Sequence, residues 1–259
     1  MPLFEILCLS AVAALAGAIN AIAGGGTLLT FPALLFFQTA PVVANATSTV
    51  ALVIGTAGSI IGFRQHLRAV WPWLLRFAFV SVAGGLLGSF LLTRTDPRIF
   101  IQLVPFLILF ATLLFLAQGA FRRFAGFGEK AGDEPSVHHP RVWVALLFQF
   151  AVSVYGGYFG AGIGILMLAS LSFLGLRDIH QMNALKNALG SLINLIAATW
   201  FIASGLIDWP KAGVMTVGAL AGYFIGAHYS QRIPQAATRR LITAIGFAIS
   251  AAMFYRQFR

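Results

Sequence analysis

The chain alternates between long apolar stretches and short polar ones over most of its length. A helix that crosses a bilayer needs about 20 predominantly apolar residues. Stretches of about this length predict eight membrane-spanning helices, over residues 3–23, 45–63, 72–92, 99–118, 142–158, 183–204, 211–228 and 239–255. The pattern therefore predicts an all-α integral membrane protein.

Two further apolar segments are too short to cross a bilayer. Residues 27–37 and 163–174 each directly follow a glycine cluster. A helix rises about 1.5 Å per residue, so neither segment covers about 30 Å of hydrocarbon. We expect broken or re-entrant short helices here. The free N–H and C=O groups of each break must then meet protein or water, because hydrocarbon cannot satisfy them.

Charged residues concentrate in one segment, residues 119–141, whose composition predicts a loop in water. The loop divides the chain into a first transmembrane unit (1–118), a linker (119–141) and a second transmembrane unit (142–259). His138 and His139 lie in this linker. Two adjacent histidines without nearby partners indicate a solvated loop rather than a metal site.

The two transmembrane units resemble each other in sequence at an offset of 138 residues. The aligned positions are Asn45-Ala46 with Asn183-Ala184, Trp71-Pro72 with Trp209-Pro210, Ala83-Gly84 with Ala221-Gly222, Gly88 with Gly226, and Arg94 with Arg232. The glycine clusters correspond at an offset of 136. Internal duplication of a helical unit is the usual plan of secondary transporters, whose binding sites lie at the repeat interface. A duplicated scaffold without transport, such as an assembly factor, is the alternative.

Composition supports the membrane prediction and changes how the net charge is interpreted. Hydrophobic residues make up 59% of the chain and charged residues only 9%, against about 25% charged residues in soluble domains. The net charge of +10 comes from Lys and Arg residues in short clusters between the apolar stretches. Anionic lipid headgroups attract such clusters, so the expected partner is the lipid bilayer and not nucleic acid.

The distribution of Lys and Arg also predicts orientation, because cytoplasmic loops carry the excess of these residues. Both ways of threading the short segments place the 119–141 loop and residues 64–76 in the cytoplasm. The distribution favours inverted over parallel repeats only slightly. The oligomeric state stays open, with a homo-oligomer as one option.

The glycine clusters are candidate anion sites. A half-helix that begins after a break presents free N–H groups and the positive end of its dipole, and both favour an anion. The candidate residues are Gly24, Gly25, Gly26 and Thr27 at the first cluster, and Gly160 and Gly162 at the second. Close helix packing through small residues is the alternative explanation of the glycines.

Two polar stripes are the second candidate feature. In the span that begins near residue 183, polar side chains recur at three- and four-residue steps, which places them on one helix face. The candidate ligands there are Asn183, Lys186, Asn187 and Asn194. The corresponding span of the first unit offers Asn45, Ser48 and Thr49. The two stripes could face each other across the repeat axis.

Lys186 is the most informative single residue. It lies about two turns inside its predicted helix, where an unpaired charge costs at least ~2.5 kcal/mol on insertion scales. A bound anion would offset this cost, whereas the alternative is a side chain that extends to the lipid headgroups. All acidic residues fall at segment ends or in loops, so we do not expect proton coupling through Asp or Glu. We also expect no cofactor and no bound metal.

The break and stripe sequences together resemble a known family. They are Ala23-Gly24-Gly25-Gly26-Thr27-Leu28-Leu29-Thr30-Phe31-Pro32 with Asn45-Ala46-Thr47-Ser48, and Gly160-Ala161-Gly162-Ile163-Gly164 with Asn183-Ala184-Leu185-Lys186-Asn187. In these motifs the chain resembles the sulfite exporter TauE/SafE family. The resemblance covers nearly the whole chain and implies a bacterial inner-membrane permease for sulfite, sulfonates and other small organosulfur anions.

The sequence therefore predicts a secondary transporter of a small anion, sulfite or an organosulfonate, in the bacterial inner membrane. An anion channel and a transporter of another small anion, such as a carboxylate, are the alternatives. An enzyme is not expected, because the two stripes contain no Asp, Glu, His or Cys to act as nucleophile, acid or base.

Overall fold

All regular structure in the described part of the protein is helical, as predicted. The computed structural model describes residues 1–22, 25–62, 67, 70–124, 140–172, 179–229 and 235–257. The helices are α1 (Leu3–Ile22), α2 (Thr27–Phe36), α3 (Pro41–Gly62), α5 (Trp71–Arg94), α6 (Pro97–Phe124), α7 (Pro140–Tyr158), α8 (Ile163–Ser172), α9 (Ile179–Ala203), α10 (Trp209–Tyr229) and α11 (Gln235–Gln257).

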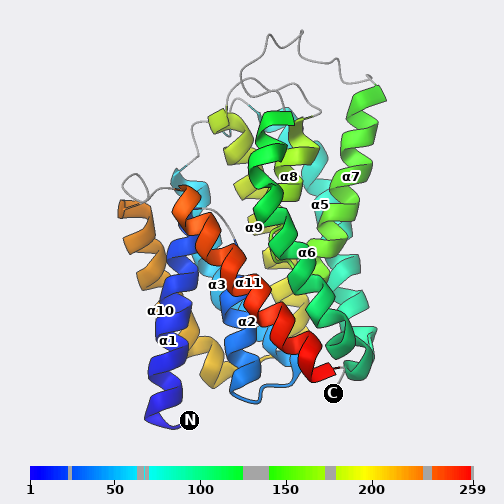
Figure 1. Ribbon diagram of the computed structural model, residues 1–259. Coiled ribbons are helices and arrows are strands. Elements are labelled where there is room, and N and C mark those ends of the chain that lie inside the picture. Colours follow the sequence, from blue (N-terminus) through cyan, green and yellow to red (C-terminus); the bar gives the residue numbers. More distant parts are fainter. Residues whose placement is uncertain are drawn as a thin grey trace.

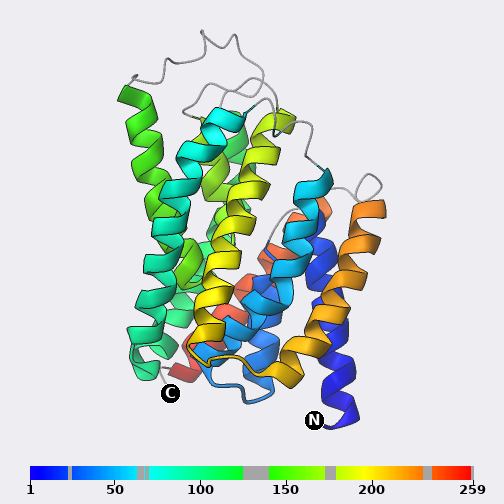
Figure 2. The same ribbon diagram turned by 180° about the vertical axis from the view of Figure 1, so that it is seen from behind.

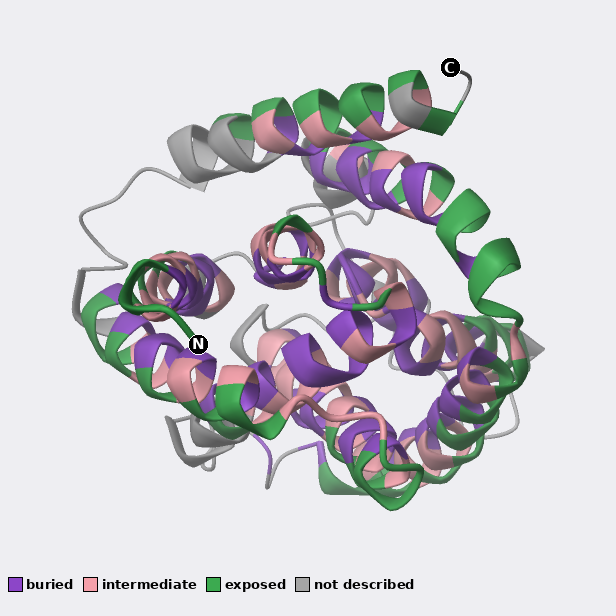
Figure 3. Ribbon diagram, turned by 90° about the horizontal axis from the view of Figure 1, so that it is seen from below, coloured by how far each residue is buried: buried purple, intermediate pink, exposed green. Residues whose placement is uncertain are grey.

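Length, composition and surface agree with a multi-pass membrane protein. Among the described residues, four stretches are long and apolar enough to cross a membrane: Leu3–Asn20, Trp71–Arg94, Pro97–Ala117 and Gln181–Ala203. The outward faces of the peripheral helices carry exposed residues, whereas the inward faces are buried (Figure 3). Large apolar side chains are among the exposed ones, with Phe79 and Phe224 both 78% accessible. Such a surface suits lipid and not water.

The two short helices predicted after the glycine clusters are confirmed. α2 and α8 are each 10 residues long. α1 rises from the end of the molecule that holds the N-terminus, and α2 runs back toward that end (Figure 1). α7 starts at the opposite end, and α8 runs back toward that opposite end (Figures 1 and 2). Each short helix therefore forms a hairpin with the long helix before it. The chain enters and leaves each hairpin at the same end of the molecule.

The two halves of the chain have the same order of helices but run in opposite directions. In each half a long helix is followed by a short one and then by three long ones. α1 and α7, the first helices of the two halves, begin at opposite ends of the molecule (Figure 1). This is the arrangement that an inverted repeat would give. The duplication itself stays a prediction from the sequence.

Each half packs its first helix against the third long helix of the other half: α1 lies along α10, and α7 lies along α5. Glycines bring these helices close. A Cβ atom at Gly222 would overlap the carbonyl oxygen of Ala14, and a Cβ atom at Gly88 would overlap that of Val154. Small residues allow such close approach between membrane helices. Close helix packing through small residues was the alternative explanation of the glycine clusters. It occurs at Gly222 and Gly88, which belong to the aligned positions of the two transmembrane units.

The predicted linker begins later than the sequence indicated. α6 continues to Phe124, beyond the predicted start of the loop at residue 119. The hydropathy pattern marks where the apolar span ends, but Ala120, Arg122 and Arg123 favour helix, so the helix continues past Gly119. α7 begins at Pro140. Residues 125–139 of the predicted loop lie outside the described part of the chain.

Candidate functional site

The two glycine breaks approach each other on α6. Phe115, which is fully buried, lies against both. A Cβ atom at Gly25 would overlap the Phe115 ring, and a Cβ atom at Gly162 would lie 3.6 Å from Phe115 Cε2. Gly25 has φ of +106° and Gly162 has φ of +78°, a region that favours glycine. The two turns at the tips of the short helices thus meet in the protein interior.

The first break is closed by protein groups. The backbone N–H of Gly26 donates to Oδ1 of Asn20 at 3.1 Å, and Nδ2 of Asn20 donates to the hydroxyl of Tyr223 at 2.7 Å. Gly25 and Gly26 are buried, Thr27 is half-buried and opens α2, and Gly24 lies outside the described residues. The sequence predicted that an anion binds at the N-terminus of α2. In the structure, Asn20 of α1 binds there, and Tyr223 of α10 holds Asn20 in place.

The second break is held by side chains from both halves. Tyr155 donates its hydroxyl hydrogen to the carbonyl oxygen of Ala161 at 2.8 Å, across the turn between α7 and α8. Asn45, on α3, donates from Nδ2 to the carbonyl oxygen of Tyr158 at 3.1 Å. Asn45 is 1% exposed, and its Oδ1 has no hydrogen-bond partner among the described residues. That oxygen is available to a hydrogen-bond donor.

The Tyr155 contact gives the first testable prediction. Tyr155→Phe removes the donor to the Ala161 carbonyl and leaves a buried acceptor unsatisfied, at a cost of about 1–3 kcal/mol. We expect the melting temperature of the purified protein to fall by several degrees. Tyr158→Phe is the matched control, because the Tyr158 hydroxyl makes a longer contact of 3.3 Å with Thr95. Equal melting temperatures of Tyr155→Phe and the wild type would show that this contact does not hold the turn.

The polar stripe of α9 lies beside α8. The ammonium group of Lys186 donates to Oδ1 of Asn183 at 3.3 Å, one turn toward the start of α9. The aliphatic part of Lys186 lies against Gly164, whose Cβ atom would be 3.5 Å from Lys186 Cδ. Asn194 lies near the second break, with its Oδ1 4.0 Å from the Cβ position of Gly160. Lys186, Asn187 and Asn194 are all half-buried.

The polar stripe of α3 is engaged mostly within the first half. The hydroxyls of Ser48 and Thr30 lie 2.6 Å apart, so Ser48 faces α2. Thr49 donates to the carbonyl oxygen of Asn45 at 2.9 Å. The two helices that carry the stripes pack together, and Ser191 of α9 donates to the backbone carbonyl of Thr56 of α3 at 2.9 Å. The predicted site residues therefore fall into two groups, with Asn45 the one that reaches the second break from the first half.

The arrangement around α8 favours a negative solute. Gly164 is in the first turn of α8, where the helix dipole gives positive potential, and the Lys186 side chain passes directly over it. Asn183 lies beside the ammonium, and its amide NH₂ adds a hydrogen-bond donor. An ammonium, the positive end of a helix dipole and an amide donor are groups that bind a small oxyanion. No group of three His, Cys, Asp or Glu side chains that could bind a metal occurs in the described ranges.

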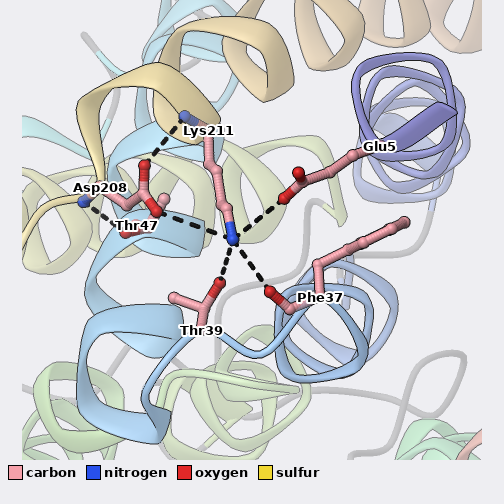
Figure 4. Close-up of polar contacts among 6 residues, drawn as sticks. All are labelled: Glu5, Phe37, Thr39, Thr47, Asp208 and Lys211. Atoms are coloured by element: carbon pink, nitrogen blue, oxygen red, sulfur yellow. Dashed lines mark hydrogen bonds and ion pairs between the residues drawn. The ribbon is translucent and has the colours of Figure 1, made fainter. Parts of the chain in front are cut away.

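A charged cluster at the end that holds the N-terminus was not predicted. We define the Lys211 cluster as Glu5, Phe37, Thr39, Thr47, Asp208 and Lys211 (Figure 4). The Lys211 ammonium lies 3.1 Å from Glu5 Oε1 and 3.8 Å from Asp208 Oδ2. It also donates to Thr39 Oγ1 at 2.9 Å and to the Phe37 carbonyl at 3.1 Å. Two features of the sequence could have indicated this cluster. Glu5 lies in the first apolar span, and Asp208 and Lys211 flank Trp209-Pro210.

Comparisons with known proteins match a family model and several relatives. The model of a family described as "Sulfite exporter TauE/SafE" matches residues 9–253. A "Probable membrane transporter protein" of Haemophilus influenzae is 32% identical over 92% of this chain and 90% of the relative. The "Probable membrane transporter protein YfcA" of Escherichia coli is 29% identical over 94% and 87% of the two chains. The "Probable membrane transporter protein YunE" of Bacillus subtilis is 23% identical over 93% of this chain and 94% of the relative. No solved structure matches the chain significantly.

Proposed function

Because the chain belongs to the sulfite exporter TauE/SafE family and is a membrane transporter, we propose that its substrate is a small anion, either sulfite or an organosulfonate. The observation that carries this proposal is the position of Lys186, whose side chain crosses the first turn of α8 at Gly164. An ammonium group and the positive end of a helix dipole repel each other weakly, and an anion between them is attracted by both.

The proposed binding site lies between α8 and the stripe of α9. Lys186 supplies charge, and Asn183, Asn187 and Asn194 supply amide donors along about three turns of one helix face. The turn at Gly160 and Gly162 supplies backbone groups near Asn194. Sulfite and sulfonates present several oxygens at a tetrahedral or pyramidal sulfur, so they accept hydrogen bonds from several directions at once. This donor arrangement suits them.

Residues of the first half frame the proposed site. Asn45 fixes the end of α7 through the Tyr158 carbonyl, and Thr49 bonds to the Asn45 backbone. Ser48 bonds to Thr30 on α2. Gly25, Gly26 and Thr27 form the first break, which α6 and Asn20 cover. A carrier that alternates between two forms would uncover the first break in the other form, because inverted halves exchange their conformations.

We also propose that the linker end of the molecule faces the cytoplasm. The end of α6, the start of α7 and the start of α5 lie together at this end (Figure 1). Arg76, Arg122, Arg123 and Arg141 belong to these segments. The positive-inside rule then assigns this end to the cytoplasm and the Lys211 cluster to the outer side of the inner membrane.

A ligand screen tests the substrate class. Purified protein is heated with sulfite, small sulfonates, sulfate, carboxylates and halides, each in excess. A ligand at about 100 times its Kd stabilises the folded state by about 2.7 kcal/mol, which raises the melting temperature by several degrees. We expect sulfite or a sulfonate to give the largest rise. A rise with carboxylates or halides, and none with sulfur oxyanions, would contradict the proposal.

Transport by the same protein in liposomes separates a carrier from a channel. We expect counterflow, in which unlabelled substrate trapped inside drives accumulation of labelled substrate from outside, because a carrier exchanges one molecule for another. A channel would let the label equilibrate without accumulation.

A further inference from the structure

The Lys211 cluster joins the two halves of the chain at one end. Glu5 lies in α1, and Phe37 and Thr39 lie in the turn between α2 and α3, all in the first half. Lys211 lies in the first turn of α10, in the second half. Its ammonium holds oxygens from both first-half segments at 2.9 to 3.1 Å. One side chain therefore ties α10 to the start of α1 and to the end of α2 (Figure 4).

Asp208 completes this connection. Its carboxylate accepts the backbone N–H of Lys211 at 3.2 Å through Oδ1, which caps the start of α10. Its own backbone N–H donates to Thr47 Oγ1 on α3 at 3.1 Å. The cluster is well shielded, because the side chains of Lys211 and Glu5 are only 12% and 10% exposed. Removal of one charge would leave its partner buried and uncompensated, so the three charges act as a unit.

The opposite end of the molecule has no equivalent cluster among its described residues. At the offset of 138, Lys211 corresponds to Trp73, Asp208 to Val70 and Thr47 to Leu185. These three residues are buried in one apolar cluster. In the described part of the chain, charges therefore link the two halves at one end, and the corresponding positions at the other end are apolar.

Charged and apolar contacts respond differently when two halves separate. Water solvates both partners of an ion pair that opens, and thereby compensates much of the lost attraction. Apolar side chains gain no such compensation, because their exposure to water is itself unfavourable. The charged end is therefore suited to an opening that lets in water and a polar solute.

We propose that Glu5, Asp208 and Lys211 are gating residues, which hold this end of the transporter closed and separate when the solute passes. The proposal rests on the transporter function and does not depend on which anion is carried. The structure has this gate closed. The gate opens when the first turn of α10 and the α9–α10 turn move away from the start of α1 and from the α2–α3 turn, while the glycine contacts farther along α1 and α10 hold.

The chain carries a natural reporter for this gate. Cys8 is its single cysteine, and it lies three residues after Glu5, on the same face of α1. Cys8 is half-buried in the closed form. A charged maleimide reacts with a thiol only where water reaches it. The test uses purified full-length protein in lipid nanodiscs, where the reagent reaches both ends, and measures the rate of Cys8 labelling without any substrate.

We expect Lys211→Met and Glu5→Gln each to raise the labelling rate by roughly tenfold or more, since a two-state gate without its closing contact is open for longer. The two variants change the local charge in opposite directions. A common increase therefore reports opening and not a change in thiol ionisation. Arg98→Met is the matched control: Arg98 is an exposed cation at the start of α6, at the same end but outside the cluster, and should leave the rate unchanged.

The variant Lys211→Arg guards against a folding defect. It keeps the positive charge and the N–H donors opposite Glu5, Asp208 and the Phe37 carbonyl, so we expect its labelling rate to stay near the wild-type value. An unchanged rate in both Lys211→Met and Glu5→Gln, with the proteins monodisperse on size exclusion, would overturn the gate. So would a Lys211→Arg variant that folds and labels at Cys8 as fast as Lys211→Met. Because no substrate is present, either result would leave the ligand screen and its interpretation unaffected.

Discussion

Replacing Lys186 with methionine is expected to abolish binding of sulfite or a sulfonate while the protein still folds. Methionine keeps the apolar stem that lies against Gly164 but removes the charge that would attract the anion. Charge-assisted hydrogen bonds are about twice as strong as neutral ones, so we expect affinity to fall at least about 100-fold. The measurement is isothermal titration calorimetry of the purified variant with the best ligand of the screen.

Two variants control this experiment. Lys186→Arg keeps the charge and should retain measurable binding, although a planar guanidinium does not reproduce the geometry of an ammonium. Asn183→Asp places a carboxylate 3.3 Å from the ammonium, at the atom that now accepts its hydrogen. It should weaken binding by competing with the anion. Undiminished binding by Lys186→Met would show that Lys186 only extends toward the headgroups.

Gly25→Ala is expected to destabilise the protein more than substitution of any helical glycine that faces open space. Alanine is strained at φ of +106°, and its Cβ would overlap the ring of Phe115. Strain and overpacking each cost of order 1–3 kcal/mol. Together they should lower the melting temperature by roughly 6 °C or more. Thermal unfolding of the purified variant measures this.

The matched control is Gly213→Ala. Gly213 lies in α10, and no atom lies within 4 Å of its Cβ position, so alanine should be tolerated or slightly stabilising. Gly25→Ala combined with Phe115→Leu relieves the overlap but not the backbone strain, and should recover only part of the loss. A melting temperature of Gly25→Ala equal to that of the wild type would mean that the two breaks do not meet at Phe115 as described.

Much of the fold could be predicted from the hydropathy pattern. The short helices after the glycine clusters follow from length, because apolar segments of 11 and 12 residues cannot cross hydrocarbon. Their direction could not be predicted. After the turn at Gly25 or Gly160, the next helix can continue in the same direction or reverse. Only its packing against α6 and the opposite half decides between the two directions. The end of α6 was also missed, since helix formers extend it past the apolar span.

The site was predictable as a set of residue types but not as a set of contacts. The three- and four-residue spacing placed Asn183 and Lys186 on one face, and they are in contact. The same logic gave Ser48 as a ligand candidate, yet its hydroxyl pairs with Thr30 of the neighbouring short helix. Asn20 was overlooked because it is a lone polar residue in an apolar span. Its contact with Tyr223 joins residues some 200 positions apart, which no local pattern reveals.

The Lys211 cluster was missed for a related reason. Each of its charges lies at the end of an apolar segment, where a charge normally meets water or headgroups and attracts no attention. Only the parallel packing of α1 and α10, which start at the same end of the molecule, brings Glu5 next to Lys211. Burial of a charge at a helix end is therefore a tertiary property that composition does not show.

The most direct test is a cryo-EM map of the protein in nanodiscs with a saturating small sulfonate. We predict density for the anion between the Lys186 ammonium and the first turn of α8, within hydrogen-bond distance of at least one asparagine of α9. A map in which the Lys186 ammonium lies among the lipid phosphates, with the second break sealed by side chains and the sulfonate bound elsewhere, would contradict the proposed site.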